Sequence, residues 1–249
     1  MRILVHGAGG HMGRIISGMA AEGRCGAELI ARVSPELQAD PEAAVYTALD
    51  DFTGEADCVI DFSHHSATGE LLRYCIGRNF PVVIATTGQT AEEREEITQA
   101  AEKIPVFFAA NMSVGVAVLC DLARRAAAAF PEADIEIIEK HHNRKLDVPS
   151  GTALMLANAI RSVREDAEFV IGRHENGKRR AQDIGIHSIR LGNEVGTHEI
   201  IISNGNETLT LKHEAENRAL FAEGAIKAAA FLCGKPAGLY NMKDMLSIN

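Results

Sequence analysis

Hydrophobic residues along the chain form two patterns, short unbroken runs and longer stretches with helical spacing. Residues 2–6 (RILVH) are mostly apolar, as in buried strands of parallel sheets, and residues 14–23 (RIISGMAAEG) have helical spacing. The alternation then continues, with apolar runs at 56–63, 81–88 and 105–113 and helical segments at 66–79 and 91–103. This order predicts an α/β fold whose N-terminal part is a Rossmann-like doubly wound parallel sheet.

The pattern changes after Met112. Helical spacing at 114–130 and 153–160 frames an alternating strand at 133–140, and three further strands with glycine and asparagine turns are expected at 183–191, 196–204 and 207–215. A last helix covers 219–234. We therefore expect an α+β C-terminal domain with an open mixed or antiparallel sheet. With only one helix of its own, that sheet leaves a surface uncovered, so we expect it to pair with copies of itself.

Composition narrows the class of protein. A chain of 249 residues with 46% hydrophobic residues can bury the core of one large domain or two. A net charge of -9 argues against binding to nucleic acid or to a membrane surface. The five cysteines are scattered without a C-x-x-C pair, which argues against disulfides and a cysteine zinc site. With no leader or membrane-spanning run in view, we expect a cytoplasmic protein.

A glycine-rich turn joins the first strand to the first helix. Gly7, Gly9, Gly10 and Gly13 stand in GAGGHMG, where small residues let the backbone approach a pyrophosphate at the start of a helix. A mere tight turn is the alternative for a lone glycine motif. The flanking strand and helix favour dinucleotide binding.

The second predicted strand bears on the choice of nucleotide. It runs into Ser34, at the position where an acidic residue usually binds the adenine ribose. Without that carboxylate NADPH is tolerated, with Arg32 or Arg14 as a neighbour of its phosphate. Glu36 leaves the question open, because a small loop shift brings it into the acidic role.

Polar residues follow the next three strands of the predicted sheet, in the segments DFS, ATTG and AANMS. Ligands of parallel sheets bind at these carboxyl ends, although each motif alone is also an ordinary turn. The candidate cofactor-binding residues are Gly7, Gly10, His11, Met12, Gly13, Ser34, Phe62, Ala85, Thr86, Thr87, Gly88, Ala109, Asn111 and Met112.

Residues 139–153 (EKHHNRKLDVPSGTA) concentrate the remaining chemistry. Ser150 or Thr152 can cap the helix that follows, and free amides beside cations bind anions. A histidine beside Lys145 suits a reaction on a carboxylate that needs a proton donor. Adjacent histidines on a strand point to opposite sides, so no metal site is expected. A surface lysine, a solvated Arg144 and a turn-capping Asp147 remain the simpler alternatives.

The motif H-H-x-x-K-x-D-x-P-S-G-T-A resembles that of the dihydrodipicolinate reductase family. Other segments follow in the family's order: GAGGHMGR, DFS, ATTG in place of the usual GTTG, NMSVGV, R-x-G-x-x-V-G-x-H at 190–198, and GLYNMKDML. The resemblance covers the whole chain, and its His-His-x-x-Lys motif is far more specific than the glycine turn.

The resemblance implies an enzyme of lysine and diaminopimelate biosynthesis that uses NADPH or NADH to reduce the cyclic dicarboxylate formed from 4-hydroxy-tetrahydrodipicolinate. It assigns His141 as the proton donor and Lys145 as its catalytic partner. Ser150, Gly151 and Thr152 would hold a carboxylate, with His142 beside them. Residues 1–112 and 219–249 would form the dinucleotide-binding domain, and 113–218 the substrate-binding and oligomerisation domain of a homotetramer.

Two other functions fit parts of the pattern. A related Rossmann oxidoreductase, such as an aspartate dehydrogenase, would turn over L-aspartate and not the cyclic substrate. A non-catalytic NAD(P)H-binding sensor would bind the nucleotide without oxidising it, and would have no need of the histidine and lysine cluster.

Overall fold

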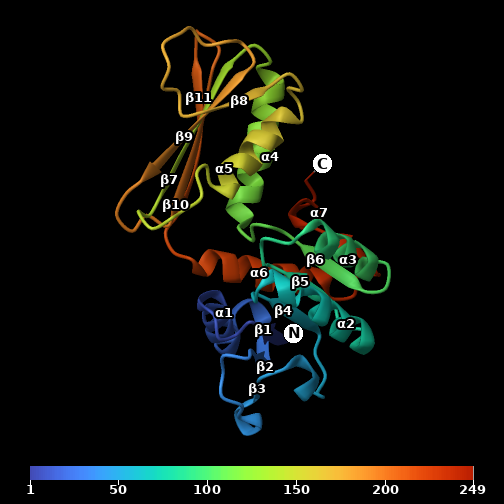
Figure 1. Cartoon of the computed structure of the whole chain (residues 1–249). Coiled ribbons are helices and arrows are strands. Elements are labelled where there is room, and N and C mark those ends of the chain that lie inside the picture. Colours follow the sequence, from blue (N-terminus) through green and yellow to red (C-terminus); the bar gives the residue numbers. More distant parts are fainter. Residues whose placement is uncertain (249) are drawn as a thin grey trace. The chain divides into compact units, whose positions relative to one another are not determined.

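The structure is a computed structural model that describes residues 1–248. The chain divides into two compact units (Figure 1). The first consists of Met1–Met112 with Ala219–Asn249, and the second of Ser113–Arg218. Among the described residues, no helix is long and apolar enough to cross a membrane.

Seven parallel strands form the sheet of the first unit, in the order β12-β6-β5-β4-β1-β2-β3. Their bounds are β1 (Arg2–His6), β2 (Glu28–Val33), β3 (Val45–Tyr46), β4 (Cys58–Asp61), β5 (Val82–Ile84), β6 (Pro105–Phe108) and β12 (Gly238–Tyr240). The predicted doubly wound sheet is confirmed. Two short edge strands, β3 and β12, were not predicted.

Helices cover both faces of this sheet (Figure 1). They are α1 (His11–Ala21), α2 (Thr68–Arg78), α3 (Ala91–Ala101), α6 (Ala219–Leu232) and α7 (Met242–Leu246), with short 3-10 turns η1 (Arg24–Gly26), η2 (Pro41–Ala43), η3 (Leu49–Asp51) and η4 (His65–Ala67). Leu4 and Val59 pack with Leu71 of α2 and Ile97 of α3. Phe107 of β6 faces the other way, with its ring 6.2 Å from that of Phe231 in α6. Burial on both faces explains why these strands are unbroken apolar runs.

The second unit contains a five-stranded mixed sheet in the order β11-β10-β7-β9-β8. Its strands are β7 (Asp134–His141), β8 (Glu168–Ile171), β9 (Asp183–Arg190), β10 (Gly196–Ser203) and β11 (Thr208–Ala215). The central strand β7 runs parallel to β9 and antiparallel to β10. The open mixed sheet was predicted, but strand β8 was not.

Two helices, α4 (Val114–Ala129) and α5 (Gly151–Arg161), pack together against one face of this sheet. Leu119 of α4 and Leu156 of α5 join Ile135 and Ile137 in its core. The expectation of a single helix was wrong, because α4 also presents an apolar stripe to the sheet. Alternate residues of β7, such as Glu136 and Ile138, lie on the opposite face and are only partly buried.

Candidate active site

The glycine turn after β1 is tight enough that side chains are excluded from it. Gly7 has a φ of 76°, and a Cβ there would lie 2.5 Å from the Ser63 nitrogen. At Gly13, a Cβ would lie 2.1 Å from the Gly7 carbonyl oxygen. Gly10 is the N-cap of α1 and makes no side-chain cap hydrogen bond. The first backbone N–H groups of the helix can therefore donate to a ligand. The turn therefore fits a pyrophosphate.

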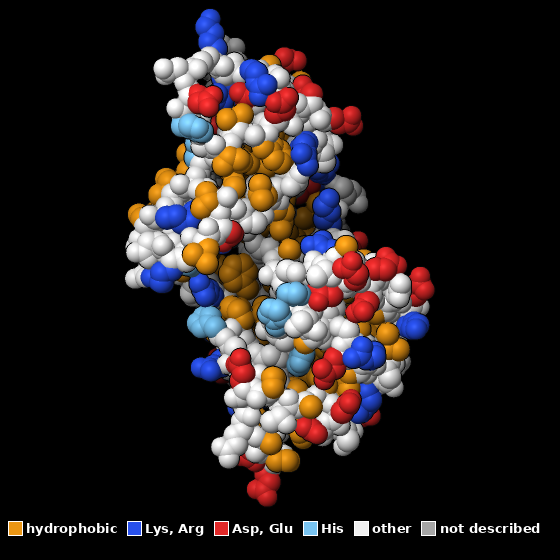
Figure 2. Space-filling model, viewed as in Figure 1, with side chains coloured by type: hydrophobic (Ala, Val, Ile, Leu, Met, Phe, Trp, Pro, Cys, Tyr) orange, Lys and Arg blue, Asp and Glu red, His pale blue; other side chains and the backbone are white. Residues whose placement is uncertain are grey.

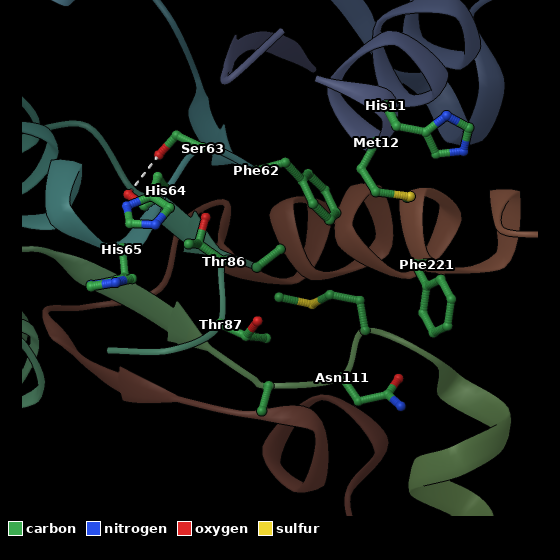
Figure 3. A pocket seen from close by; sticks show the side chains of 13 residues that line it. His11, Met12, Phe62, Ser63, His64, His65, Thr86, Thr87, Asn111 and Phe221 are labelled. Atoms are coloured by element: carbon green, nitrogen blue, oxygen red, sulfur yellow. Dashed lines mark hydrogen bonds between the residues drawn. The ribbon is translucent and has the colours of Figure 1, made fainter. Parts of the chain in front are cut away.

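Two adjoining pockets in the first unit share Phe62, Ser63 and His64 in their walls. The larger one, of about 590 Å³, is lined by His11, Met12, Phe62, Ser63, His64, His65, Ala85, Thr86, Thr87, Ala110, Asn111, Met112 and Phe221 (Figure 3). The second, of about 460 Å³, is lined by residues that include Gly7, Gly10, Ser34, Pro35 and Glu36. Together they offer a long site around the glycine turn, as a dinucleotide requires.

A buried polar network holds the loops at this edge of the sheet. Asp61 ends β4 and accepts hydrogen bonds from Thr86 Oγ1 at 2.7 Å and from the Ser63 amide at 3.1 Å. Its other contact is His6 Nδ1, at 2.9 Å. His6 and Asp61 are opposite each other in the register of β1 and β4. The network links Thr86, which lines the larger pocket, to the ends of β1 and β4. It therefore fixes the position of this part of the pocket wall.

Most of the sequence-predicted nucleotide residues gather around the two pockets. Gly13, Gly88 and Ala109 line neither of these pockets. Gly13 instead allows α1 to pack on the turn, and Gly88, with a φ of 94°, faces the ring of His65. Neither Arg14 nor Arg32 lines the second pocket.

In the second unit, Glu139 and His141 form a buried polar pair. Both lie on β7, two residues apart, so their side chains share one face of the sheet. His141 Nδ1 lies 2.5 Å from Glu139 Oε2, and Glu139 is fully buried. His141 itself is 8% exposed, which leaves its ring at the edge of the buried region.

Arg190 and the start of α5 complete the environment of Glu139. Arg190, at the end of β9, donates through Nη1 and Nη2 to both carboxylate oxygens, at 2.8 and 2.7 Å. The Ser150 amide donates to Oε1 at 3.2 Å. Burial alone raises the pKa of Glu139, but the hydrogen bonds from His141 and Arg190 outweigh it and hold the pKa well below the usual range. Glu139 is therefore a carboxylate at neutral pH.

A second imidazole, His198, lies beside His141 on the neighbouring strand β10. The two rings meet edge-on, with centroids 5.2 Å apart, and His198 Nε2 lies 3.2 Å from Ser150 Oγ. Burial, with the charge of His141, lowers the pKa of His198 to about 3. His198 stays neutral, whereas His141 is next to a carboxylate. The two environments separate the roles of the two rings.

The start of α5 has features that suit an anion site. Ser150 is the N-cap, and its Oγ accepts from the Ala153 amide at 3.2 Å. Gly151, the first residue of the helix, is exposed, and a Cβ there would meet nothing within 4 Å. The Gly151 backbone N–H interacts with the Asp147 carboxylate, so a carboxylate already lies at the positive end of the helix dipole.

Lys145 and His142 lie in the loop between β7 and α5. Lys145 Nζ pairs with Asp147 Oδ1 at 2.8 Å. His142 Nε2 accepts a hydrogen bond from Arg218 Nη2 at 3.3 Å, and burial together with the charges of Arg144 and Arg218 lowers the pKa of His142. A neutral His142 is suited to contact a ligand and not to supply a proton.

Sequence reasoning missed Glu139, Arg190 and His198 as site residues. Arg190 and His198 stand in the R-x-G-x-x-V-G-x-H segment, which indicated the family but no role for either residue. Pairing of β9 and β10 with β7 is what brings them to His141.

Among the described residues, no group of three or more histidine, cysteine or acidic side chains is arranged to hold a metal ion. Figure 2 shows acidic and basic side chains interspersed over the face in view.

The first unit combines a parallel Rossmann sheet with a glycine turn that has no room for side chains and with two adjoining pockets. These features define an oxidoreductase that uses a pyridine nucleotide. The family model for the N-terminus of dihydrodipicolinate reductase matches residues 1–112, and the model for its C-terminus matches residues 115–246. The chain belongs to the dihydrodipicolinate reductase family.

Curated relatives agree over nearly the full length. A 4-hydroxy-tetrahydrodipicolinate reductase of Caldanaerobacter subterraneus subsp. tengcongensis is 44% identical, with 99% of this chain and 98% of the relative covered. One of Clostridium tetani is 41% identical, with 99% and 97% covered. The solved structure of a dipicolinate-bound dihydrodipicolinate reductase from Paenisporosarcina sp. TG-14 has a TM-score of 0.82 and 27% identity, with 98% of each chain covered.

These matches confirm the resemblance inferred from the motifs and the expectation of an oxidoreductase. The rival activity has only the fold in common with this chain. An aspartate dehydrogenase from Thermotoga maritima covers 95% of this chain, with 98% of its own length aligned, at a TM-score of 0.51 and 15% identity.

Proposed function

We propose that the chain uses NADH or NADPH to reduce the cyclic, unsaturated dicarboxylate formed from 4-hydroxy-tetrahydrodipicolinate to tetrahydrodipicolinate, in lysine and diaminopimelate biosynthesis. The observation that carries this proposal is the Glu139–His141 pair beside the N-terminus of α5. A proton donor next to amides that bind carboxylates is the combination that reduction of an anionic, unsaturated substrate needs, and this pair supports that assignment.

The two units have different roles in this proposal. The first binds the nucleotide, through the glycine turn and the residues of the two pockets. A bound NADH or NADPH supplies the hydride. The second binds the dicarboxylate and provides the sheet for assembly. These roles are supported by the separate family models for the two parts of the chain.

In the second unit, the substrate carboxylate is bound by Ser150, Gly151 and Thr152 at the start of α5, with His142 as a neutral neighbour. Lys145 supplies the compensating charge. Its present partner, Asp147, has a side chain that is 57% exposed and can turn to solvent when a carboxylate takes its place. His141 gives its proton to the substrate, which completes the reduction.

A coupled assay tests the reaction, with the unstable substrate supplied fresh by the preceding synthase and nucleotide oxidation followed by absorbance. His141→Gln should lose about 10²–10⁴-fold in kcat while nucleotide affinity and the melting temperature stay near wild type. Lys145→Ala should raise KM for the dicarboxylate and leave nucleotide affinity unchanged. Near-normal turnover by His141→Gln would remove His141 from the proton-donor role. Turnover of L-aspartate in place of the cyclic substrate would refute the reaction itself.

The second pocket bears on which nucleotide is used. Ser34 Oγ accepts a hydrogen bond from the Glu36 amide at 3.4 Å, which draws Glu36 over the glycine turn. A Cβ at Gly9 would lie 3.0 Å from Glu36 Oε2. We propose that this carboxylate takes the acidic role and favours NADH over NADPH, because it repels a 2'-phosphate.

Titration of NADH and NADPH fluorescence measures this preference directly. Glu36→Gln should raise the affinity for NADPH relative to NADH. Glu42→Gln, which removes an exposed carboxylate from η2, is the matched charge control and should leave the ratio unchanged. If Glu36→Gln left the ratio of NADPH to NADH affinity unchanged, Glu36 would have no part in nucleotide preference, and only the argument from Ser34 would remain.

For assembly, we propose a homotetramer formed through the face of the second unit's sheet opposite α4 and α5. Ile138, Ile201 and the 41% exposed Ile189 lie on that face among charged residues. Light scattering on the purified protein should give four times the chain mass of 26.8 kDa. Ile189→Glu should lower that mass. A cytoplasmic location is also proposed, since a biosynthetic reductase works where its nucleotide is found and the five cysteines are free.

A further inference from the structure

The surroundings of His141 determine which of its two nitrogens is available for chemistry. Its Nδ1 is 2.5 Å from Glu139 Oε2. Because an ionised carboxylate only accepts hydrogen bonds, Nδ1 must be the donor in this contact. The neutral ring therefore has its hydrogen on Nδ1, and Nε2 remains for exchange with a substrate.

Several groups keep Glu139 ionised and in place. The paired guanidinium of Arg190 and the Ser150 amide donate to it, so with His141 both of its oxygens are used twice. Arg190 is itself anchored by the Asp147 carbonyl, at 2.8 Å from Nη2. A planar guanidinium that binds both oxygens leaves the carboxylate little freedom to rotate. The carboxylate, and the ring that it holds, are preorganised.

The space around Nε2 is kept open by a glycine. A Cβ at Gly196 would lie 3.1 Å from His141 Nε2 and 3.8 Å from His198 Cε1. The charged and titratable groups that contact His141 or its carboxylate partner are Glu139 on its own strand, Arg190 on β9 and His198 on β10. The loop that follows β7 carries the Lys145–Asp147 ion pair. Among the three contacting groups, Glu139 is the anion, and it touches the His141 ring directly.

We propose that Glu139, clamped by Arg190, is a positioning residue that fixes the tautomer of His141 and makes Nε2 the proton donor. The N–H bond at Nε2 breaks, and its proton goes to the substrate atom made basic by the added hydride. The ring is left neutral, with Nδ1–H still bonded to Glu139. Solvent then returns a proton to Nε2. This inference rests on the proposed role of His141 and adds the residue that sets its geometry.

Glu139→Gln tests the proposal in the full-length enzyme. The amide can accept from His141 Nδ1 only by turning its NH₂ group toward Arg190, where two donors would oppose each other. We expect kcat to fall by about 10²-fold. This lies between the ~10-fold decrease that follows removal of an orienting partner and the ~10⁴-fold decrease that follows when the histidine adopts the wrong tautomer. KM for the nucleotide should not change. The alkaline limb of the kcat profile should move to lower pH, because the anion in contact with the donor ring is gone.

Glu136→Gln is the matched control. Glu136 is also on β7 and also contacts a histidine and an arginine, His187 at 2.7 Å and Arg179 at 3.3 Å, but on the opposite face of the sheet. It should leave kcat and the pH profile unchanged. A merely structural role for Glu139 would lower the melting temperature and leave the pH limb where it is.

A spectroscopic measurement decides the question even if Glu139→Gln fails to fold. The ¹⁵N shifts of the His141 ring in the native enzyme, assigned by difference from His141→Gln among the ten histidines, should show hydrogen on Nδ1 when the ring is neutral. A neutral ring with hydrogen on Nε2 would overturn the proposal. So would wild-type kcat and an unmoved pH limb in Glu139→Gln, provided that His141→Gln is inactive. If His141→Gln is also fully active, it is the proposed proton-donor role of His141 that has failed instead.

Discussion

Replacing a single glycine of helix α1 should separate tight packing from helix propensity. At Gly13 the new methyl group would lie 2.1 Å from the Gly7 carbonyl oxygen and 2.6 Å from Ala8 Cα. Both are backbone atoms, so the glycine turn and the helix must move apart by about 1 Å. Overpacking of this kind costs about 1–3 kcal/mol. For a chain of this size it lowers the melting temperature by about 2–12 °C.

Gly18→Ala, in the same helix, is the matched control. A Cβ at Gly18 meets nothing within 4 Å, and the position is exposed. Alanine is about 1 kcal/mol better than glycine inside a helix, so this variant should melt a few degrees higher. The two substitutions add the same atom in the same helix and are expected to act in opposite directions.

Calorimetry and nucleotide fluorescence titration measure both effects. Gly13→Ala should also weaken NADH binding by about 10-fold or more, because 1.4 kcal/mol lost at the pyrophosphate amides is a factor of ten. Gly18→Ala should bind as wild type does. A Gly13→Ala variant with unchanged melting and unchanged affinity would refute the claim that this turn needs to be free of side chains.

Three further predictions follow from single residues. Thr86→Val removes the 2.7 Å hydrogen bond to buried Asp61, and should cost about 1–3 kcal/mol in urea unfolding and weaken nucleotide binding. Because His198 has a pKa of about 3 when folded and about 6.5 when unfolded, its contribution to stability is complete above that upper value. Stability should fall as the pH drops from 6.5 toward 3, and the fall should be shallower in His198→Asn. A thiol reagent should modify the exposed Cys25 and Cys233 of the native protein first.

Local patterns were sufficient for most of the first unit. The central strands β1, β4 and β5 are buried on both faces, so unbroken hydrophobic runs marked them one by one. The edge strand β12 escaped notice, because its three residues are paired only through the register Gly238–Pro105 to Tyr240–Phe107, across more than half the chain. In the second unit β8 was missed for another reason: it has only four residues, Glu168–Ile171, and none of them is fully buried.

The sequence by itself determined the glycine turn, the alternation of strands and helices, the Ser150 cap and the neighbourhood of His141 on its strand. These depend on residues within a few positions of one another, where spacing and residue type set the geometry. Only the tertiary structure decided that Arg190 and His198, 51 and 59 positions from Glu139, meet strand β7. Their approach depends on the pairing of β9 and β10 with β7, and so does the charge that His141 experiences. Hydrogen-bonded registers between distant strands leave no mark at a fixed spacing, and for that reason they could not be predicted from the sequence alone.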